Sequence, residues 1–462
     1  MRNSTTRIKL NKNLLTSALV WLVIWQVLAL SINNVLLLPG PLDTARALLG
    51  MLADTEFYMN AGWTVARSLL GMVFSFVTGA AAAWAAYRVK PLRTILALPV
   101  GFFKAVPVMA IIIYVILLAK ADWVAVIVCF FMCFPVVYIN VLEGFDSTSE
   151  ELLEVAHIYE LTPAQKRRLI YWPGALPQIK ASIKLITGLS WKAVVAAEVL
   201  SIPQFSLGYE MMNAKYYLET EKLFAYIVVI VILSLCLEKL INKWATSLEP
   251  HNYEGSKLGE DRQMSKTGPS PEIRIKNLSK SFGEKKVLDG VYINFEADKT
   301  TVIMEPSGRG KTTLMRIIAG LETKDSGEVI SSRELKTSML FQEDRLIPWL
   351  NIYDNLLLSG GDKTSVVKMA ESLEIEDVLW KLPKELSGGM NHRVALGRTF
   401  LTKANLMILD EPFRGLDNEL KNRIIDRLWE RVTTDKTVLV VTHNSEDAKL
   451  LGDIVIEDFC CQ

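Results

Sequence analysis

The sequence lacks an excess of charge of either sign and contains few cysteines. Lysine and arginine number 51 against 50 aspartate and glutamate, so no overall charge draws the chain to nucleic acid. Five cysteines in 462 residues are too few, and odd in number, for a secreted disulfide scaffold. Half of the residues are apolar, which excludes an intrinsically disordered chain. A length of 462 residues predicts two or three domains.

The two halves of the chain differ in charge and hydropathy. Residues 1–250 contain 21 basic and 16 acidic side chains, whereas residues 251–462 contain 30 and 34. Long uncharged runs occur only before residue 242. The composition therefore predicts a membrane half followed by a soluble half.

Six apolar runs in the first half are long enough to cross a bilayer as helices, which takes roughly 17–25 residues. They cover residues 14–32, 64–87, 95–119, 123–142, 183–200 and 223–241. Basic residues gather before the first run, between the second and third, between the fourth and fifth, and after the sixth. Because such residues mark cytoplasmic loops, we expect a lipid bilayer around six spans and both chain ends in the cytoplasm. The alternative, helices of a large soluble core, would leave too little polar surface.

The loop between the fourth and fifth runs has helical signals of its own. Ser147 and Glu150 have the spacing of a capping box, which predicts a helix start at this point. Thr162, followed by Pro163 and Gln165, predicts a second helix start. The first helix would carry four apolar side chains on one face: Leu152, Val155, Ala156 and Tyr159. Nothing within the loop covers that face, so we expect another part of the protein to bury it.

A polar segment separates the two halves. Residues 249–271 contain almost no apolar side chain and predict a flexible linker. From Ile273 onward, short β-rich runs alternate with helical stretches, which is typical of an α/β domain with a largely parallel sheet. We therefore expect an α-helical transmembrane domain over 1–248, with a cytosolic loop over 143–177, and an α/β domain of the phosphate-loop type over 272–462.

A phosphate-binding loop is predicted where a strand at 300–304 leads into a helix. Glycines in the intervening EPSGRGKTT would let backbone N–H groups surround phosphate oxygens, and the helix N-terminus adds partial positive charge. The expected nucleotide-binding residues of this loop are Glu305, Pro306, Ser307, Gly308, Arg309, Gly310, Lys311, Thr312 and Thr313. Lys311 would reach the β- and γ-phosphates of ATP, and Thr312 would bind Mg²⁺.

Glu305 departs from the pattern, which opens with glycine. A side chain forced into a glycine-type conformation is strained, and a carboxylate near the β-phosphate would repel it. Two interpretations stay open: Glu305 points away from the nucleotide and the loop works, or it weakens ATP binding. Every downstream element of the loop is intact, which favours the first.

Two later strands end in polar side chains suited to phosphate chemistry. Asp410 and Glu411 close an apolar strand. Asp410 would hold Mg²⁺, directly or through water, and Glu411 would act as a general base on the attacking water. His443 closes another buried strand; a lone histidine there is usually structural, but in this combination we assign it to the γ-phosphate.

The ordered motifs of residues 272–450 resemble those of the ABC transporter ATPases. LSGGM, residues 386–390, followed by RVALGR, looks like the ABC signature. Gln342 resembles the glutamine of the Q-loop, Asp417 the aspartate of the D-loop, and Phe282 the aromatic residue that stacks on adenine. The resemblance implies that Gln342 joins Thr312 and Asp410 at Mg²⁺. It also implies that the signature contacts ATP bound by a second ATPase through Ser387, Gly388, Gly389 and Met390.

The first half resembles the permeases of the nitrate/sulfonate/taurine importer group over roughly residues 60–245. The cytosolic loop, with Glu154, Ala156 and the later PGALP, looks like the coupling loop of these permeases. Glu160 stands where that loop usually has glycine. The resemblance implies that the loop helix docks in a groove of the ATPase beside Gln342 and passes motion to the spans.

The family resemblance also implies partners. One chain carries one copy of each motif, whereas in the family each ATP lies between two ATPases. A second copy of the chain, or a similar partner, is therefore expected, with a separate extracytoplasmic solute-binding protein. The implied activity is ATP-driven uptake of a small solute across a bacterial inner membrane, with the N-terminus and ATPase in the cytoplasm. Nitrate, sulfonates such as taurine, and vitamin precursors lie within the family's range, and some of these are anions.

Two other functions stay open on sequence grounds. The order of spans followed by ATPase is typical of exporter half-transporters, although the short cytosolic turn at 88–94 argues against one. A regulatory ATPase pair with impaired hydrolysis is motivated by Glu305. A neighbouring gene for a secreted binding protein would favour import.

Three of the charged residues within the predicted spans are singled out as candidates, because burying a charge in a membrane is costly and points to function. Lys104 lies near the middle of the third run, and Lys192 and Glu198 lie in the fifth. They are candidates for a pathway that prefers anions. The alternative, which we favour, is that Lys192 and Glu198 neutralise partners within the helix bundle.

Overall fold

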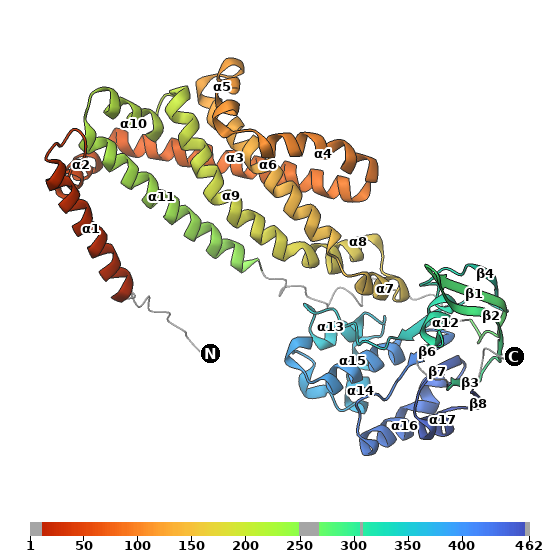
Figure 1. Cartoon of the computed structure of the whole chain (residues 1–462). Helices are drawn as coiled ribbons and strands as arrows, with labels where there is room; N and C mark the ends of the chain where they lie inside the picture. Colours follow the sequence, from red (N-terminus) through yellow and green to blue (C-terminus); the bar gives the residue numbers. More distant parts are fainter. Residues whose placement is uncertain (1–11, 249–267, 305–307, 458–462) are drawn as a thin grey trace. The chain divides into compact units, whose positions relative to one another are not determined.

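The computed structural model describes residues 12–248, 268–304 and 308–457. It divides into two compact units, which Figure 1 draws as one chain. The helical unit comprises Met1–Ser147 and Gly174–Leu248, and the α/β unit comprises Thr148–Pro173 and Glu249–Gln462. The loop between the fourth and fifth apolar runs thus groups with the α/β unit, not with the helices that flank it.

The helical unit consists of long helices joined by short connections. Its described helices are α1 (Lys12–Ile32), α2 (Pro41–Leu52), α3 (Thr55–Arg88), α4 (Lys90–Ala105), α5 (Val108–Leu118), α6 (Ala121–Asp146), α9 (Trp172–Ser201), α10 (Leu207–Tyr216) and α11 (Thr220–Ser247). Among the described residues, α3, α6 and α11 are each long and apolar enough to cross a membrane. The helix α9 has 30 residues but carries three lysines and Glu198, and it does not qualify. The number of six spans therefore stays a prediction.

The expectation of one continuous third span over 95–119 is wrong. The chain forms two helices there, α4 and α5, which are bent by 105° relative to each other. The break falls at Val106 and Pro107: Val106 has φ −70° and ψ 130°, and Pro107 is the N-cap of α5. The cause is proline chemistry, because Pro107 has no N–H to donate and disfavours helical geometry at the residue before it.

The helices α3 and α6 approach each other closely through small residues. A Cβ atom at Gly71 would lie 2.6 Å from the Cys129 sulfur, and one at Gly79 would lie 2.9 Å from Val137 Cβ. Such contacts let two membrane helices pack backbone to backbone. Cys129 is fully buried in this interface.

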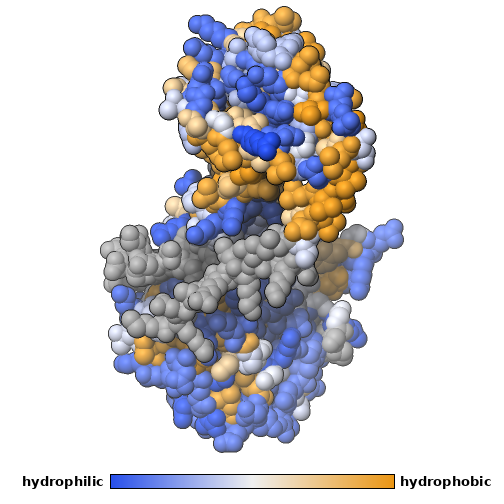
Figure 2. Space-filling model, turned by 90° about the vertical axis from the view of Figure 1, so that its left-hand side faces the viewer, coloured by the Kyte–Doolittle hydropathy of each residue, from blue (hydrophilic) through white to orange (hydrophobic). Residues whose placement is uncertain are grey.

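The surfaces of the two units differ in polarity. Figure 2 shows large orange areas on the helical unit, in the upper part of the view, and a mostly blue surface on the α/β unit. The exposed apolar side chains of the helical unit include many on α1, α3 and α5, such as Trp21, Phe74 and Leu117. A surface of this kind suits lipid rather than water.

The α/β unit contains two sheets with helices around them (Figure 1). Its strands are β1 (Ile273–Phe282), β2 (Lys285–Phe295), β3 (Thr300–Ile303), β4 (Ser326–Ser331), β5 (Thr337–Leu340), β6 (Leu406–Asp410), β7 (Thr437–Val441) and β8 (Ile454–Ile456). Its helices are α7 (Glu150–Ile158), α8 (Pro163–Lys166), α12 (Lys311–Ile318), α13 (Ile352–Leu357), α14 (Lys363–Ser372), α15 (Gly388–Leu401), α16 (Asn418–Thr433) and α17 (Ser445–Leu451). A π-helical turn, Arg167–Tyr171, follows α8.

The larger sheet is parallel and has the strand order β5-β6-β7-β3-β8. The smaller sheet is antiparallel and has the order β2-β1-β4. The strands β3, β6 and β7 are fully buried, which is why they read as short continuous apolar runs in the sequence. The expected α/β class with a largely parallel sheet is confirmed.

Candidate functional site

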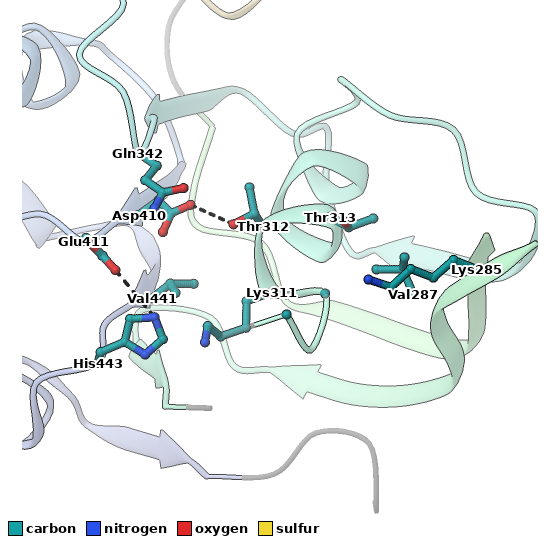
Figure 3. Close-up of a pocket in the computed structure, with 12 residues that line it drawn as sticks. Lys285, Val287, Lys311, Thr312, Thr313, Gln342, Asp410, Glu411, Val441 and His443 are labelled. Carbon is teal, nitrogen blue, oxygen red and sulfur yellow. Dashed lines mark hydrogen bonds and ion pairs between the residues drawn. The ribbon is translucent and has the colours of Figure 1, made fainter. Parts of the chain in front are cut away.

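The topology of the parallel sheet brings three polar segments together. The strands β6, β7 and β3 are neighbours, so the residues that follow them meet at one edge of the sheet. A cavity of about 330 Å³ opens at this edge (Figure 3). It is lined by Lys285, Val287, Gly308, Gly310, Lys311, Thr312, Thr313, Gln342, Asp410, Glu411, Val441 and His443.

The described part of the phosphate loop adopts a backbone that requires glycine. Gly308 and Gly310 have φ of 86° and 87°, in the left-handed region. A Cβ atom at Gly310 would also lie 2.8 Å from the carbonyl oxygen of Val287. Lys311 begins α12 and is buried at the cavity wall. The geometry suits a loop that places backbone N–H groups and one ammonium group around phosphate.

The residues Glu305, Pro306 and Ser307 lie outside the described residues. The expected strain or repulsion at Glu305 therefore stays a prediction. Arg309 is described and exposed, and it does not line the cavity.

Thr312 and Asp410 form a pair suited to a divalent cation. The Thr312 hydroxyl donates a hydrogen bond to an Asp410 carboxylate oxygen at 3.1 Å (Figure 3). Burial raises the pKa of Asp410, and the hydrogen bond from Thr312 partly offsets this effect. A cation at this point would stabilise the buried carboxylate. Mg²⁺ prefers oxygen ligands and is commonly held by one or two protein groups together with substrate phosphates, so these residues fit it.

Glu411 and His443 lie next to each other in the cavity wall. Glu411 Oε1 lies 3.5 Å from His443 Nε2 (Figure 3). Glu411 has φ 50°, unusual for a residue with a side chain, and its N–H donates to the Val441 carbonyl oxygen at 2.9 Å. The bond to β7 holds this conformation at the strand end. Strain of this kind is commonly kept where a side chain must be aimed at a reaction centre.

Several predicted site residues do not line this cavity. Phe282 ends β1, is 49% exposed and lies under the Lys280 ammonium group, 5.0 Å from the ring centre. Ser387 caps the N-terminus of α15, where its hydroxyl accepts from the Met390 N–H. Asp417 caps α16 through the Leu420 N–H. The signature residues Ser387, Gly388, Gly389 and Met390 do not line this cavity either.

The sequence motifs missed Val441, which ends β7, and two further lining residues, Lys285 and Val287. Both lie on β2, and Lys285 follows directly on the turn after β1. No motif marks them. The antiparallel pairing of Phe282 with Lys285 could have suggested that β2, and not only Phe282, faces the nucleotide.

The loop helix α7 begins two residues later than predicted. Ser149, not Ser147, is its N-cap and accepts a hydrogen bond from the Leu152 N–H. The Ser147 hydroxyl instead donates to the Gly144 carbonyl oxygen, because Ser147 is the C-cap of α6. The second predicted start is confirmed: Thr162 and Gln165 form a complete capping box at α8.

The apolar face of α7 is buried within the α/β unit. Val155 and Tyr159 belong to a buried cluster that includes Met339 on β5 and the adjoining Phe341. Other buried residues of the cluster come from α12 and the two sheets. Leu152 and Ala156 pack in a second cluster with Ile347, Leu350 and Leu358. The expectation that another part of the protein covers this face is confirmed, and part of the cover, Phe341 and Ile347, flanks Gln342 in sequence.

Glu154 ties α7 to two arginines that the sequence analysis did not identify. Its carboxylate accepts two hydrogen bonds from Arg316, on α12, at 2.8 and 2.6 Å, and a third from Arg345. Burial alone would raise the pKa of Glu154, but these hydrogen bonds lower it below its ordinary value. The carboxylate is therefore ionised at neutral pH.

A small cavity connects this ion pair to the nucleotide cavity. Its volume is about 80 Å³, and its lining includes Arg316 and Arg345 together with Thr312, Gln342 and Asp410. The arginines that hold Glu154 thus share a cavity with the residues expected to bind Mg²⁺.

Glu160 forms the turn after α7 although it is not glycine. Its φ is 48°, in the left-handed region, and its N–H donates to the His157 carbonyl oxygen at 3.0 Å. The Leu161 N–H closes the turn on the Ala156 carbonyl oxygen at 2.9 Å. A sharp turn after α7 is therefore formed, with some backbone strain at Glu160.

A buried ion pair joins α3 and α9 in the helical unit. Arg67 lies 3.0 Å from Glu198, and their side chains are 6% and 0% exposed. Thr64 donates to the other Glu198 oxygen at 2.9 Å. Arg67 also donates to the carbonyl oxygens of Gln204 and Phe205, both at 3.0 Å. The favoured interpretation of Glu198, neutralisation by a partner, is confirmed, and Arg67 is the partner.

Lys192 and Lys104 are placed differently from expectation. Both side chains are exposed in this chain, so the expected neutralisation of Lys192 inside the bundle is not observed among the described residues. Lys104 lies in the last turn of α4, next to the break at Pro107, and not in the middle of a continuous span. Their role in a pathway stays a prediction.

Replacing Arg67 by methionine should destabilise the helical unit strongly, because it leaves the Glu198 carboxylate buried without its charged partner. Breaking a buried pair in this way costs about 3–5 kcal/mol. Combining it with Glu198→Gln should recover part of the loss in the thermal unfolding of the detergent-solubilised chain. Arg46→Met, at a side chain that is 81% exposed, is the matched control. Additive effects of the two buried substitutions would show that the pair is not coupled.

Two family models match the chain over separate segments. Residues 75–250 match the binding-protein-dependent transport system inner membrane component, and residues 288–414 match the ABC transporter ATPase. The first covers most of the helical unit and the coupling loop, and the second includes all described cavity residues before Val441 except Lys285 and Val287.

Curated relatives match the ATPase part of the chain. An aliphatic sulfonates import ATP-binding protein of Paracoccus denitrificans is 35% identical over 191 residues, which cover 40% of this chain and 79% of that protein. One from Streptomyces avermitilis is 36% identical over 194 residues, which cover 40% and 76%. Among solved structures, the dimeric bacterial ABC transporter cassette MJ0796 is 28% identical and covers 40% of this chain and 93% of its own, with a TM-score of 0.36. The chain therefore belongs to the ABC transporter family, as an importer in which a membrane permease and an ATP-hydrolysing, transport-coupled ATPase are fused in one polypeptide.

Proposed function

We propose that two copies of this chain form an importer that takes up a small solute delivered by a separate solute-binding protein. In this assembly each ATP is bound between the phosphate loop of one copy and the signature of the other. The two permease parts together enclose the pathway. We further propose that the protein lies in a bacterial inner membrane with its N-terminus and ATPase in the cytoplasm.

One observation carries the proposal of a dimer. The cavity has Lys311, Glu411 and His443 for the phosphates and the water, but the signature residues do not line it. Ser387 and Gly388, at the start of α15, are exposed. Their N–H groups and hydroxyl, together with the α15 N-terminus, would suit an anion brought by a second copy. A single chain therefore provides one half of each of two ATP sites and no complete site.

The proposed chemistry at each site follows from the cavity geometry. Lys311 and the loop N–H groups bind the phosphates and orient the γ-phosphate. Glu411 holds the attacking water and accepts its proton, while His443, 3.5 Å from Glu411, contacts the γ-phosphate. Thr312, Asp410 and Gln342 would hold Mg²⁺, which neutralises developing phosphate charge when bound.

The proposed transmission of motion runs through Glu154. The carboxylate binds Arg316, on the helix that starts at the phosphate loop, and Arg345, just beyond Gln342. A shift of α12 or of the Gln342 segment on ATP binding would move α7 with it. Since α7 lies between α6 and α9 in sequence, that motion reaches two membrane helices directly.

The solute that we propose first is an aliphatic sulfonate or a similar small anion. The support is the printed function of the curated relatives, which are named for aliphatic sulfonate import. Lys104 and Lys192, exposed in the single chain, are candidates to attract an anion in the assembled pathway.

A mixed-chain experiment tests the dimer. A chain with Lys311→Met has no working phosphate loop, and a chain with Ser387→Arg has no working signature. Alone, each should be inactive. Co-expressed under two tags and purified through both, they should recover about half of the wild-type ATP turnover, because one of the two composite sites is intact. Two differently tagged Lys311→Met chains serve as the control. A mixed sample no more active than its parents would refute shared sites.

We expect the natural phosphate loop to bind and hydrolyse ATP despite Glu305. Glu305→Gly should tighten ATP binding by less than about tenfold, or roughly 1.4 kcal/mol, because the described downstream residues already form the cavity. Nucleotide titrations of both forms measure the difference. Undetectable ATP binding by the natural chain, restored by glycine, would mean that Glu305 disables the loop.

A further inference from the structure

A second cavity in the α/β unit shares no lining residue with the nucleotide cavity. Its volume is about 370 Å³, within the range of small-molecule sites, which is roughly 300–1,000 Å³. Its walls come from α14 and the loop before it, the C-terminal ends of α15 and α16, and the residue before β7. The motifs and the proposed function assign it no role.

Part of the lining of this cavity is apolar. Met369, Phe400, Leu428 and Val432 line it and are at least nine-tenths buried. These side chains come from three helices, α14, α15 and α16. These side chains can contact a small hydrocarbon group, while the polar remainder of the lining, which is the larger part, suits a charged headgroup.

The walls carry four cationic side chains, Lys368, Lys403, Arg431 and Lys436. Within the described part of the chain, none of the four forms an ion pair. The acidic lining residue, Asp362, accepts the Ser365 N–H at 2.7 Å as the N-cap of α14, and the nearby charge of Lys403 also helps to lower its pKa, so one carboxylate stands against four cations. The cavity is therefore positive, although residues 251–462 as a whole carry 34 acidic against 30 basic side chains.

Lys436 is the most enclosed of these cations. Burial lowers its pKa to about 8, because burial destabilises the charged ammonium form relative to the neutral amine. An anion in the cavity would stabilise the charged form. Arg431 and Lys403 lie in or directly after the last turns of α16 and α15, where the helix dipole leaves partial negative charge that also favours cations.

The two helices that end at this cavity begin at residues of the proposed dimer contact. The N-cap of α15 is Ser387, in the signature, and the N-cap of α16 is Asp417, in the D-loop. A ligand that joins the C-terminal ends of α15 and α16 would restrict their relative movement. Their N-terminal ends, and with them the signature and D-loop, would be restricted as well.

We propose that this cavity binds a small organic anion, with a sulfonate or phosphate headgroup on an apolar body, and that its occupancy alters ATP turnover through α15 and α16. The headgroup contacts Lys436, Arg431 and Lys403, and the body lies on Met369, Phe400 and Leu428. The binding step is independent of the proposed function. The effect on turnover rests on the proposed use of the signature by a second copy.

Binding is tested by calorimetry on the full chain carrying Glu411→Gln, with ATP present to fill the nucleotide cavity. The probes are hexane-1-sulfonate and hexyl phosphate, with hexan-1-ol as the uncharged control. We expect at least one anion to bind, and the alcohol to bind at least about tenfold more weakly. Lys436→Met should weaken anion binding at least about tenfold, whereas Lys449→Gln, which removes an exposed charge elsewhere on the same unit, should not.

The two anions identify the headgroup: preference for one assigns the site to sulfonates or to phosphate esters. Failure of both anions to bind at millimolar concentration, or equal binding by the natural residue and Lys436→Met, would overturn the site. Equal binding of hexan-1-ol and the anions would do so too, because it would show an apolar pocket only.

ATP turnover is measured separately in chains that keep Glu411. The bound anion should change turnover by about fivefold or more in the natural chain and leave Lys436→Met unchanged. Cooperative thermal unfolding of Lys436→Met without anion, at or above the midpoint of the natural chain, shows that it folds. Binding without any change in turnover would overturn the regulatory part alone. Failure of the mixed-chain experiment would not affect the calorimetric result.

Discussion

Replacing Glu411 by glutamine should leave ATP binding intact and slow ATP hydrolysis by at least about 100-fold. Glutamine keeps the shape of the side chain but cannot accept a proton from the attacking water. Glu411 lines the cavity beside Asp410 and lies 3.5 Å from His443, so no other carboxylate among the described lining residues is free for this role. Asp410 is already engaged by the Thr312 hydroxyl.

The measurement is steady-state ATP hydrolysis by the purified chain, with nucleotide affinity determined in parallel. Glu430→Gln, which neutralises an exposed carboxylate on α16, is the control and should behave like the natural chain. Near-normal turnover in Glu411→Gln would assign the general base elsewhere. Loss of ATP binding would mean that the substitution disturbs the loop and not the chemistry.

Charging the buried face of α7 should abolish transport while ATP binding persists. Val155 is 0% exposed and Tyr159 4% exposed in the cluster with Phe341, so Val155→Glu with Tyr159→Glu would bury two unpaired carboxylates if α7 stayed docked. Separation of α7 from the rest of the α/β unit costs less free energy than burying the two carboxylates. The α/β unit loses a surface helix but keeps its nucleotide cavity, which α7 does not line.

Uptake by vesicles that contain the variant measures this loss, and nucleotide titration checks the cavity. His157→Glu adds one charge to the exposed side of the same helix and should leave uptake nearly unchanged. Normal uptake by the doubly charged variant would show that α7 does not couple the two units. Loss of uptake in the control as well would point to a general effect of charge in the loop.

The ATPase part of the site was predictable because its chemistry is local. Glycines with φ near 87°, a lysine at a helix start and carboxylates at a strand end are each dictated by a short stretch of chain. The alternation of strands and helices then brings Asp410 and His443 to the loop, since parallel neighbours share an edge. Lys285 and Val287 were not predicted because they reach the cavity from the antiparallel sheet, where no motif marks them.

Partner residues distant in sequence could not be predicted in the same way. The sequence identified Glu154 and Glu198, but not the arginines that bind them, because Arg316, Arg345 and Arg67 become neighbours only through tertiary packing. Arg67 interrupts an apolar helix only once, so its run still reads as a span. Its separation of 131 residues from Glu198 carries no pattern.

Two predictions, the continuous third span and the start of α7 at Ser147, were wrong although the sequence contained a signal against each. Pro107 lies within the third apolar run, and its effect on Val106 breaks the helix, but hydropathy alone reads through it. Ser147 and Ser149 both precede the acidic start of α7. The capping-box spacing favoured Ser147, whereas the end of α6 already uses that residue as its C-cap and leaves Ser149 to start α7.

The most direct test of import is the direction of ATP-driven transport by this chain without any other membrane or ATPase subunit. Proteoliposomes that contain the purified chain, an aliphatic sulfonate and its binding protein are supplied with ATP on the side of the ATPase. We predict that radiolabelled solute accumulates in the compartment that holds ATP, and that Glu411→Gln abolishes the accumulation. Movement of solute out of that compartment, or accumulation that persists in Glu411→Gln, would contradict this prediction.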